Sequence, residues 1–233
     1  MSDTHMAPVD FVQRLRSNAF SDLDVSSHEL DLQGWVQPGF EESLRVVADA
    51  LAGARDSASP RRDLTVFEIG TWKGASACKI ADALKGRLRS LVCVDTWLGA
   101  PEFYTTFIDE PCRFANDHVH GWPQTYHTFI KNVKALGHDD VVVPFPISSA
   151  QAAVVLRFYD IRAHAIYVDA SHEYDAVLAD LEAFRDLVLP GGIMWGDDYG
   201  HPLFPGLAKA VDEFAARHGY GVEVRGINWM IRM

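Results

Sequence analysis

Short runs of apolar residues alternate along most of the chain with longer stretches in which apolar residues recur at helical spacing. The continuous runs predict strands at 64–69, 91–94, 141–143, 165–168, 192–195, 222–224 and 229–231. Helical spacing predicts helices at 40–55, 75–84, 126–136, 150–159, 174–188 and 207–217, with a loop at 56–62. Buried strands separated by amphipathic helices are typical of a mostly parallel sheet covered on both faces. We therefore predict an α/β fold with a doubly wound sheet.

The last two predicted strands differ from the others because only residues 225–228 separate them. Strands joined so tightly must run antiparallel, since a parallel crossover needs a dozen or more residues. This C-terminal hairpin argues against a simple dinucleotide-binding domain.

Two segments follow neither period. Residues 1–38 are polar with scattered aromatic residues, and they predict an N-terminal lid or a partly mobile segment preceding a domain at 39–233. Residues 96–123 carry many aromatic side chains in a connection that is long for a compact domain. We interpret this aromatic segment as a wall or flap of the active site, with a plain surface insertion as the alternative.

Composition narrows the class of protein. A chain of 233 residues that is 48% hydrophobic and 23% charged is long enough for one globular domain. The net charge of −11 and the lack of a basic cluster disfavour nucleic-acid binding. No apolar run is long enough to span a membrane, and the three cysteines have no metal-ligand spacing. We expect a cytoplasmic protein, and the N-terminal segment could serve as an interface in a homo-oligomer.

A glycine-containing turn follows the first predicted strand, with the sequence EIGTWKG at 68–74. Glycines at this point allow positive φ and close approach of a ligand to the start of the next helix, although they can also serve turn geometry alone. Asp95 ends the next strand, where a carboxylate can accept hydrogen bonds from the hydroxyls of a ribose. The spacing of Gly70 and Gly74 departs from the pyrophosphate-binding pattern, which favours a nucleoside cofactor without a pyrophosphate.

Three aspartates follow two later strands, Asp169 after one and Asp197 with Asp198 after the next. The ends of neighbouring parallel strands lie at one edge of a sheet, so these carboxylates can converge. Hard oxygen ligands suit Mg²⁺, with Mn²⁺ as a second choice. The alternative is structural: Asp197 or Asp198 caps a turn and Asp169 accepts hydrogen bonds from loop amides.

Together these motifs resemble a known family. The segments EIGTWKGAS at 68–76, VDTW at 94–97, DASHEY at 169–174, PGG at 190–192 and GDDYG at 196–200 are similar to those of class I methyltransferases related to macrocin O-methyltransferase. The resemblance extends from about Phe40 to the C-terminus. It implies a Rossmann-like, seven-stranded sheet with an antiparallel last strand, bound S-adenosylmethionine and Mg²⁺-dependent transfer to a hydroxyl, as in natural product biosynthesis.

The resemblance also implies roles for individual residues. Contacts with the cofactor are expected from Glu68, Gly70, Thr71, Trp72, Gly74, Ser76, Asp95, Thr96, Ser148 and Ser149. In this set the methionine part lies by Glu68, Gly70 and Gly74, the ribose by Asp95 and the adenine edge by Ser148 and Ser149. Asp169, Asp197 and Asp198 match the metal positions, with a spacing that also resembles catechol O-methyltransferase.

The general base is where the chain departs from the family pattern. Macrocin-type enzymes tend to have a second acidic residue two positions after the first metal aspartate, and here that position is Ser171. His172 falls where the catechol enzyme has a basic residue, and an imidazole suits proton transfer near neutral pH. We take His172 as the candidate base, against a purely structural histidine, and His201 as the reserve.

The predicted function is therefore an S-adenosylmethionine-dependent O-methyltransferase acting on a small-molecule hydroxyl of a natural-product, sugar or phenolic acceptor. Metal-independent methyl transfer is the first alternative. A nicotinamide-dependent oxidoreductase and a non-catalytic nucleoside-binding module are the others, and the glycine spacing and C-terminal hairpin disfavour the oxidoreductase.

Overall fold

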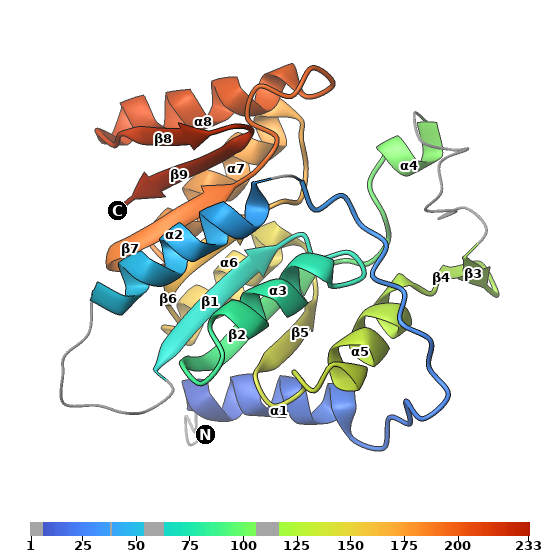
Figure 1. Cartoon of the computed structure of the whole chain (residues 1–233). Helices are drawn as coiled ribbons and strands as arrows, with labels where there is room; N and C mark the ends of the chain where they lie inside the picture. Colours follow the sequence, from blue (N-terminus) through green and yellow to red (C-terminus); the bar gives the residue numbers. More distant parts are fainter. Residues whose placement is uncertain (1–6, 38, 54–62, 106–116) are drawn as a thin grey trace, which may run out of the picture.

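The computed structural model describes residues 7–37, 39–53, 63–105 and 117–233. Its main sheet has seven strands in the order β5-β2-β1-β6-β7-β9-β8 (Figure 1). Their bounds are β1 Leu64–Ile69, β2 Leu88–Asp95, β5 Val142–Pro146, β6 Ala163–Val168, β7 Val188–Gly196, β8 Val222–Arg225 and β9 Asn228–Arg232. The first five of these strands in the spatial order pair in parallel, whereas β9 is antiparallel to both β7 and β8. The predicted mostly parallel sheet and its C-terminal hairpin are confirmed.

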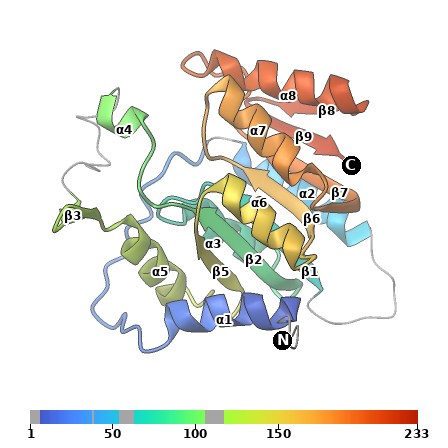
Figure 2. The ribbon, with the colours of Figure 1, turned by 180° about the vertical axis from the view of Figure 1, so that it is seen from behind.

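Helices cover both faces of this sheet. Their bounds are α1 Pro8–Phe20, α2 Phe40–Gly53, α3 Ala75–Ala83, α4 Glu102–Thr105, α5 Thr125–Ala135, α6 Ser149–Phe158, α7 Tyr174–Arg185 and α8 Pro205–His218. Buried side chains of α2, α3 and α5 belong to one hydrophobic cluster, and those of α6, α7 and α8 belong to the other. Figures 1 and 2 show these two groups of helices on opposite faces. The fold is thus doubly wound, as the sequence predicts.

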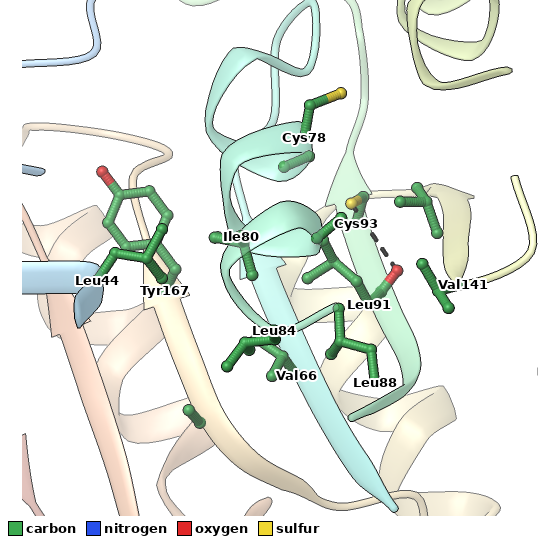
Figure 3. Packing of buried hydrophobic residues seen from close by; sticks show 14 of the residues in the cluster. Leu44, Val66, Cys78, Ile80, Leu84, Leu88, Leu91, Cys93, Val141 and Tyr167 are labelled. Atoms are coloured by element: carbon green, nitrogen blue, oxygen red, sulfur yellow. Dashed lines mark hydrogen bonds between the residues drawn. The ribbon is translucent and has the colours of Figure 1, made fainter. Parts of the chain in front are cut away.

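The core explains why the strands are continuous apolar runs. All six residues of β1 are buried, because Val66 faces one cluster while Phe67 and Ile69 face the other. On the first face, Ile80 and Leu84 are fully buried against the sheet (Figure 3). Each such side chain contributes roughly 1.5–3 kcal/mol by its removal from water.

One predicted helix boundary is wrong, and the aromatic segment contains secondary structure that was not predicted. The helix predicted to reach residue 188 ends at Arg185, and Val188 instead begins β7. Leu187 and Val188 are both buried, so their apolar character fits a helix or a strand equally well. The aromatic segment contains α4 and a two-stranded hairpin, β3 His118–Val119 with β4 Trp122–Pro123. The loop predicted at 56–62, the centre of the aromatic segment and Cys112 lie outside the described residues.

The N-terminal segment begins with α1, which packs along β5 at the edge of the sheet. Phe11 on this helix stacks on Tyr159 with ring centroids 4.4 Å apart and meets Phe145 edge-on. After α1 the chain continues without regular secondary structure to residue 37 and then enters α2. None of the described helices is both long and apolar enough to cross a membrane.

Candidate active site

The glycine loop, residues 70–74, connects the end of β1 to α3. Gly70, Trp72 and Gly74 all have positive φ, at 85°, 50° and 90°. A side chain at Gly70 would place its Cβ 2.0 Å from the carbonyl oxygen of Asp169, so the loops after β1 and β6 can meet at this distance only with a glycine. The backbone conformation of the loop thus favours glycine at both Gly70 and Gly74.

Asp95 holds the glycine loop from the end of β2. Its Oδ2 accepts hydrogen bonds from the backbone N–H groups of Thr71 and Trp72, both at 2.9 Å, and its Oδ1 accepts one from the N–H of Trp97 at 2.7 Å. The Trp97 indole N–H then donates to the carbonyl of Trp72 at 2.7 Å. Asp95 therefore organises the loop, and its contact with a ribose stays a prediction.

Glu68 supports the same loop from beneath. Its side chain is fully buried, and its Oε2 accepts hydrogen bonds from the Thr71 hydroxyl at 2.9 Å and the Cys93 thiol at 3.5 Å. Burial raises the pKa of this carboxyl to about 7. Its Oε1 has no hydrogen-bond partner among the described residues. Glu68 is thus part of the loop's foundation.

A cavity of about 630 Å³ opens above the carboxyl ends of β1, β2, β6 and β7. Most of the residues predicted for the site line it, namely Gly70, Thr71, Trp72, Ser76, Asp95, Thr96, Ser148, Ser149, Asp169, His172, Asp198 and His201. Three predicted residues, Glu68, Gly74 and Asp197, are not among its lining. Ligand sites in open α/β sheets lie at this edge, and the volume is typical of small-molecule pockets.

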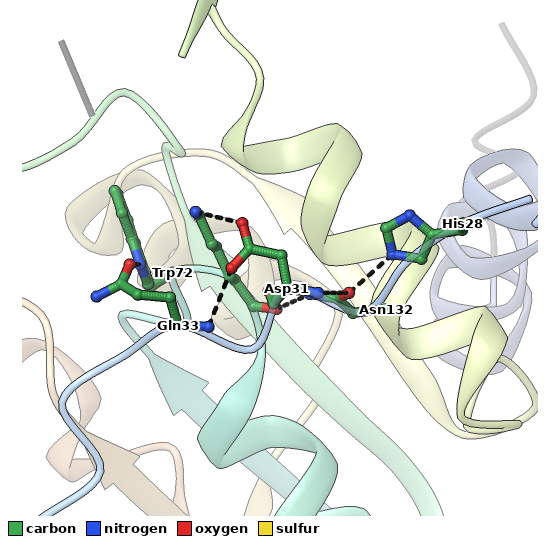
Figure 4. A network of polar contacts seen from close by, with 6 residues as sticks. His28, Asp31, Gln33, Trp72 and Asn132 are labelled. Atoms are coloured by element: carbon green, nitrogen blue, oxygen red, sulfur yellow. Dashed lines mark hydrogen bonds and ion pairs between the residues drawn. The ribbon is translucent and has the colours of Figure 1, made fainter. Parts of the chain in front are cut away.

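The N-terminal strap, defined here as residues 28–37, forms part of the cavity wall through its residues 34–37. Asn132 of α5 is fully buried and donates to the carbonyls of Asp31 and Lys73 at 2.6 and 2.9 Å (Figure 4). Its Oδ1 accepts a hydrogen bond from the Asp31 N–H at 3.1 Å and lies 2.8 Å from the His28 ring nitrogen. The Lys73 ammonium pairs with the Asp31 carboxylate at 2.6 Å. These contacts fasten the strap to the glycine loop.

Aromatic rings join the strap to the loops around the cavity. Trp35 of the strap stacks on Phe103 with centroids 5.5 Å apart and an interplanar angle of 17°. Trp72 lies 4.7 Å from Phe103, and its indole N–H donates to the Gln33 side chain at 3.0 Å. Trp35, Trp72 and Phe103 all line the cavity, and we call them the ring wall.

Acidic groups and a histidine gather at the ends of β6 and β7. One potential ligand atom from each of Asp169, His172 and Asp198 lies within 4.8 Å of the other two. The His172 Nε2 is 3.2 Å from the Asp198 Oδ2, and the buried Asp198 Oδ1 has no hydrogen-bond partner among the described residues. Burial, reinforced by the neighbouring carboxylates, raises the pKa of Asp169 well above its ordinary value. We call Asp169, His172 and Asp198 the acidic cluster, and such a group of ligand atoms can hold a cation.

Asp197 is not part of this group of possible ligand atoms. It is buried, and its carboxyl forms side-chain hydrogen bonds with Asp169 and with Tyr167. Burial and the charge of Asp198 raise its pKa to about 7. The predicted metal set was Asp169, Asp197 and Asp198, whereas the group of possible ligand atoms consists of Asp169, His172 and Asp198. Asp197 contacts this group through its hydrogen bond with Asp169 and is not among the cavity lining.

The two predicted bases share an aromatic neighbour. His172 stacks on Phe204 with centroids 3.9 Å apart and an interplanar angle of 15°, and His201 lies 5.1 Å from the same ring. The fixed ring plane of His172 presents one nitrogen to Asp198. His172 therefore lies beside Asp198, and His201 also lines the cavity next to the same phenyl ring.

Comparison with known proteins identifies the family. A family model described as a methyltransferase domain matches residues 67–199, which include the glycine loop, Asp95 and the acidic cluster. The chain belongs to this methyltransferase family. A search of curated proteins finds no match.

Solved structures share the fold of this methyltransferase. An O-methyltransferase from Bacillus cereus in complex with S-adenosylhomocysteine has 14% identity and a TM-score of 0.57, covering 99% of this chain and 93% of that one. CalS11, a calicheamicin methyltransferase, has 18% identity and a TM-score of 0.57, with 98% and 94% covered. TomG from Streptomyces achromogenes, in complex with S-adenosylmethionine, has 15% identity and a TM-score of 0.54, with 99% and 90% covered.

Several parts of the methyltransferase site were missed in the sequence. The strap lies within the segment predicted as a lid or partly mobile segment, but no motif pointed to its individual residues, and Phe204 likewise reaches the cavity only through tertiary contacts. Asp180 of α7 is a buried carboxyl in the cavity lining, hydrogen-bonded to Ser149, and burial raises its pKa to about 6. A signal for Asp180 existed, because an acidic residue on the apolar face of an amphipathic helix is unusual.

Proposed function

We propose that this methyltransferase transfers the methyl group of S-adenosylmethionine to a hydroxyl of a small natural-product, sugar or phenolic acceptor, with a divalent cation holding the acceptor oxygen. One observation carries the proposal. The glycine loop and the acidic cluster of Asp169, His172 and Asp198 line the same cavity, so a cofactor at one and an acceptor oxygen at the other would share one space.

The donors fit a cation such as Mg²⁺, with Mn²⁺ as the second choice. Asp169 and Asp198 offer carboxylate oxygens, which Mg²⁺ prefers over nitrogen or sulfur. The Asp198 Oδ1 is buried with no hydrogen-bond partner among the described residues, a costly arrangement that a bound cation would relieve. When bound, the cation would lower the pKa of the acceptor hydroxyl and fix its oxygen.

The protein's own residues would supply orientation and proton transfer. The glycine loop, held by Asp95, would position the cofactor, and the strap would close the cavity over it. We assign the proton-accepting role to His172, because its ring is held between Asp198 and Phe204 beside the acidic cluster. His201 is the reserve base. Most of the rate enhancement would then come from holding the two reactants in line.

The first test measures binding before turnover. S-adenosylhomocysteine and Mg²⁺ should each raise the melting temperature of the purified protein. Asp198→Asn should keep the affinity for S-adenosylhomocysteine within about 3-fold while losing the response to Mg²⁺, because Asp198 would hold the cation whereas Asp95 holds the loop that would position the cofactor. Asp175→Asn removes an exposed aspartate of α7 and serves as the matched control. Absence of any response to S-adenosylhomocysteine would refute the cofactor, and full activity in chelator would refute the metal role.

A second candidate is metal-independent methyl transfer. The 3.2 Å contact between His172 and Asp198 forms a histidine–carboxylate pair that could deprotonate a phenol without a cation. In that case activity should persist in chelator and fall by roughly 100-fold or more in His172→Gln, since general base catalysis is typically worth that much. The described residues offer no observation that favours the nicotinamide alternative.

A further inference from the structure

The charged side chains in the described lining of the cavity are mainly acidic. Four carboxyl groups line it, those of Asp95, Asp169, Asp180 and Asp198, and its described lining contains no lysine or arginine. Lys73 is in the glycine loop, but it is buried and its ammonium is paired with Asp31 at 2.6 Å. His172 and His201 are the basic side chains of the described lining, and His172 is engaged with Asp198.

Some of the backbone amides near the cavity are already engaged in hydrogen bonds. The N–H groups of Thr71 and Trp72 donate to Asp95 instead of to open space. At the start of α6, the Ser148 hydroxyl accepts the N–H of Gln151. Helix N-termini and loop amides are the usual substitute for lysine and arginine in holding a phosphate. In the described lining, a phosphate or pyrophosphate group would therefore find no lysine or arginine, and the amides of Thr71 and Trp72 are already engaged.

An anionic acceptor would be disfavoured for a second reason. The positive charge of a sulfonium cofactor and of a divalent cation would be balanced by the four carboxylates, leaving no excess for a phosphate. Charge-assisted hydrogen bonds are each worth about 1.5–3 kcal/mol. An acceptor that lacks even one such partner for its phosphate would bind roughly 10- to 100-fold more weakly than its uncharged counterpart.

The ring wall indicates what the cavity can bind instead. Trp35 lines the cavity and is 44% exposed although it stacks on Phe103. Trp72 and Phe103 continue this surface. Aromatic faces bind planar rings and the apolar faces of sugars without requiring charge.

We infer that the acceptor is an uncharged, ring-bearing molecule, and that nucleotide-linked sugars and coenzyme A thioesters are excluded. The inference rests on the proposed function, because it concerns the acceptor of that reaction. Its basis is the joint occurrence in one cavity of four carboxyl groups, an aromatic wall and no lysine or arginine among the described lining residues.

The experiment compares matched probes that differ in a remote charge. The first pair is 3,4-dihydroxybenzyl alcohol and its phosphate monoester, and the second is phenyl β-glucoside and UDP-glucose. Binding is measured by calorimetry on the full chain saturated with S-adenosylhomocysteine, with and without Mg²⁺. The uncharged member of at least one pair should bind, with its charged counterpart at least about 10-fold weaker.

Two lysine variants test whether the cavity charge is the cause. Gln37→Lys places an ammonium in the cavity lining of the strap and should reduce the preference for the uncharged probe by about 10-fold. Leu30→Lys makes the same change in net charge at an exposed strap residue that is not part of the lining, and it should leave the preference unchanged. Trp35→Ala should weaken the uncharged probe by about 3- to 10-fold while Trp35→Phe retains it.

Three outcomes would overturn the inference. These are a charged probe that binds the wild type as tightly as its uncharged partner, no binding of any uncharged probe to protein that does bind S-adenosylhomocysteine, and equal effects of the two lysines. Failure of the proposed function has a different signature, because S-adenosylhomocysteine itself would then not bind.

Discussion

Asn132 is the residue on which the attachment of the strap depends most. It is fully buried in α5, and its amide group contacts residues about 60 and about 100 positions earlier in the chain. Asn132→Leu keeps a side chain of similar size and removes every one of these hydrogen bonds. The replacement therefore tests the polar network of Figure 4 with little change in packing.

The expected cost follows from the groups left behind. The N–H and C=O of the partly buried Asp31 and the C=O of the buried Lys73 each lose a partner, and each such loss costs about 1 kcal/mol. His28 is partly exposed, so its ring can return to water at little cost. The sum is about 3 kcal/mol, which corresponds to a decrease of about 6–12 °C in the melting temperature of a chain of this size.

The assay is thermal unfolding followed by circular dichroism, combined with limited proteolysis of the strap. Asn132→Leu should melt lower and be cleaved faster within residues 21–37, and its affinity for S-adenosylhomocysteine should fall because strap residues line the cavity. Asn18→Leu, at an exposed position of α1, is the matched control. A loss below about 1 kcal/mol, or unchanged cleavage of the strap, would refute the reasoning.

Other predictions concern single groups around the site. Gly70→Ala should abolish binding of S-adenosylhomocysteine because its Cβ would lie 2.0 Å from a backbone oxygen, whereas Gly86→Ala, with φ 79° and nothing within 4 Å, should cost only about 1–2 kcal/mol in a denaturant titration. Burial raises the pKa of Asp180 from 3.8 to about 6, so the folded state holds the proton more tightly and stability should fall as pH rises from about 4 to about 6. Asp180→Asn should remove up to about 3 kcal/mol of that pH dependence, and an unchanged pH profile of unfolding would contradict this. Burial also raises the thiol pKa values of Cys78, to about 12, and of Cys93, so neither should react with a thiol reagent until guanidinium unfolds the protein, as peptide mass spectrometry would show.

Most secondary structure was readable from the chain because its signals are local. β1 was predicted with the observed bounds, since four of its six residues are apolar and all six are buried. The helix predicted to continue to residue 188 shows the limit of such signals, because a buried apolar residue at a boundary satisfies either period. The order of the strands, including the position of β9 between β7 and β8, was not predicted, because it depends on pairing between distant segments.

The candidate site was predictable to the extent that it lies at strand ends. Gly70, Asp95, Asp169 and Asp198 each follow a strand, and parallel strands end at one edge. Adjacent residues could not be told apart in this way. Asp198 adopts φ 57° and reaches the cavity lining, whereas Asp197 turns toward Tyr167, and only the tertiary packing decides between them.

Local periodicity and the polar residues at strand ends thus determined the fold class, the glycine loop and the acidic edge of the sheet. Each of these signals is contained in a short stretch of neighbouring residues. The strap, the ring wall and the His172–Asp198 contact were decided by the tertiary structure. Trp35 meets Phe103, and Asp31 meets Asn132, across long separations in the chain. Such contacts leave no periodic pattern in the sequence, because they depend on where the completed sheet carries each loop.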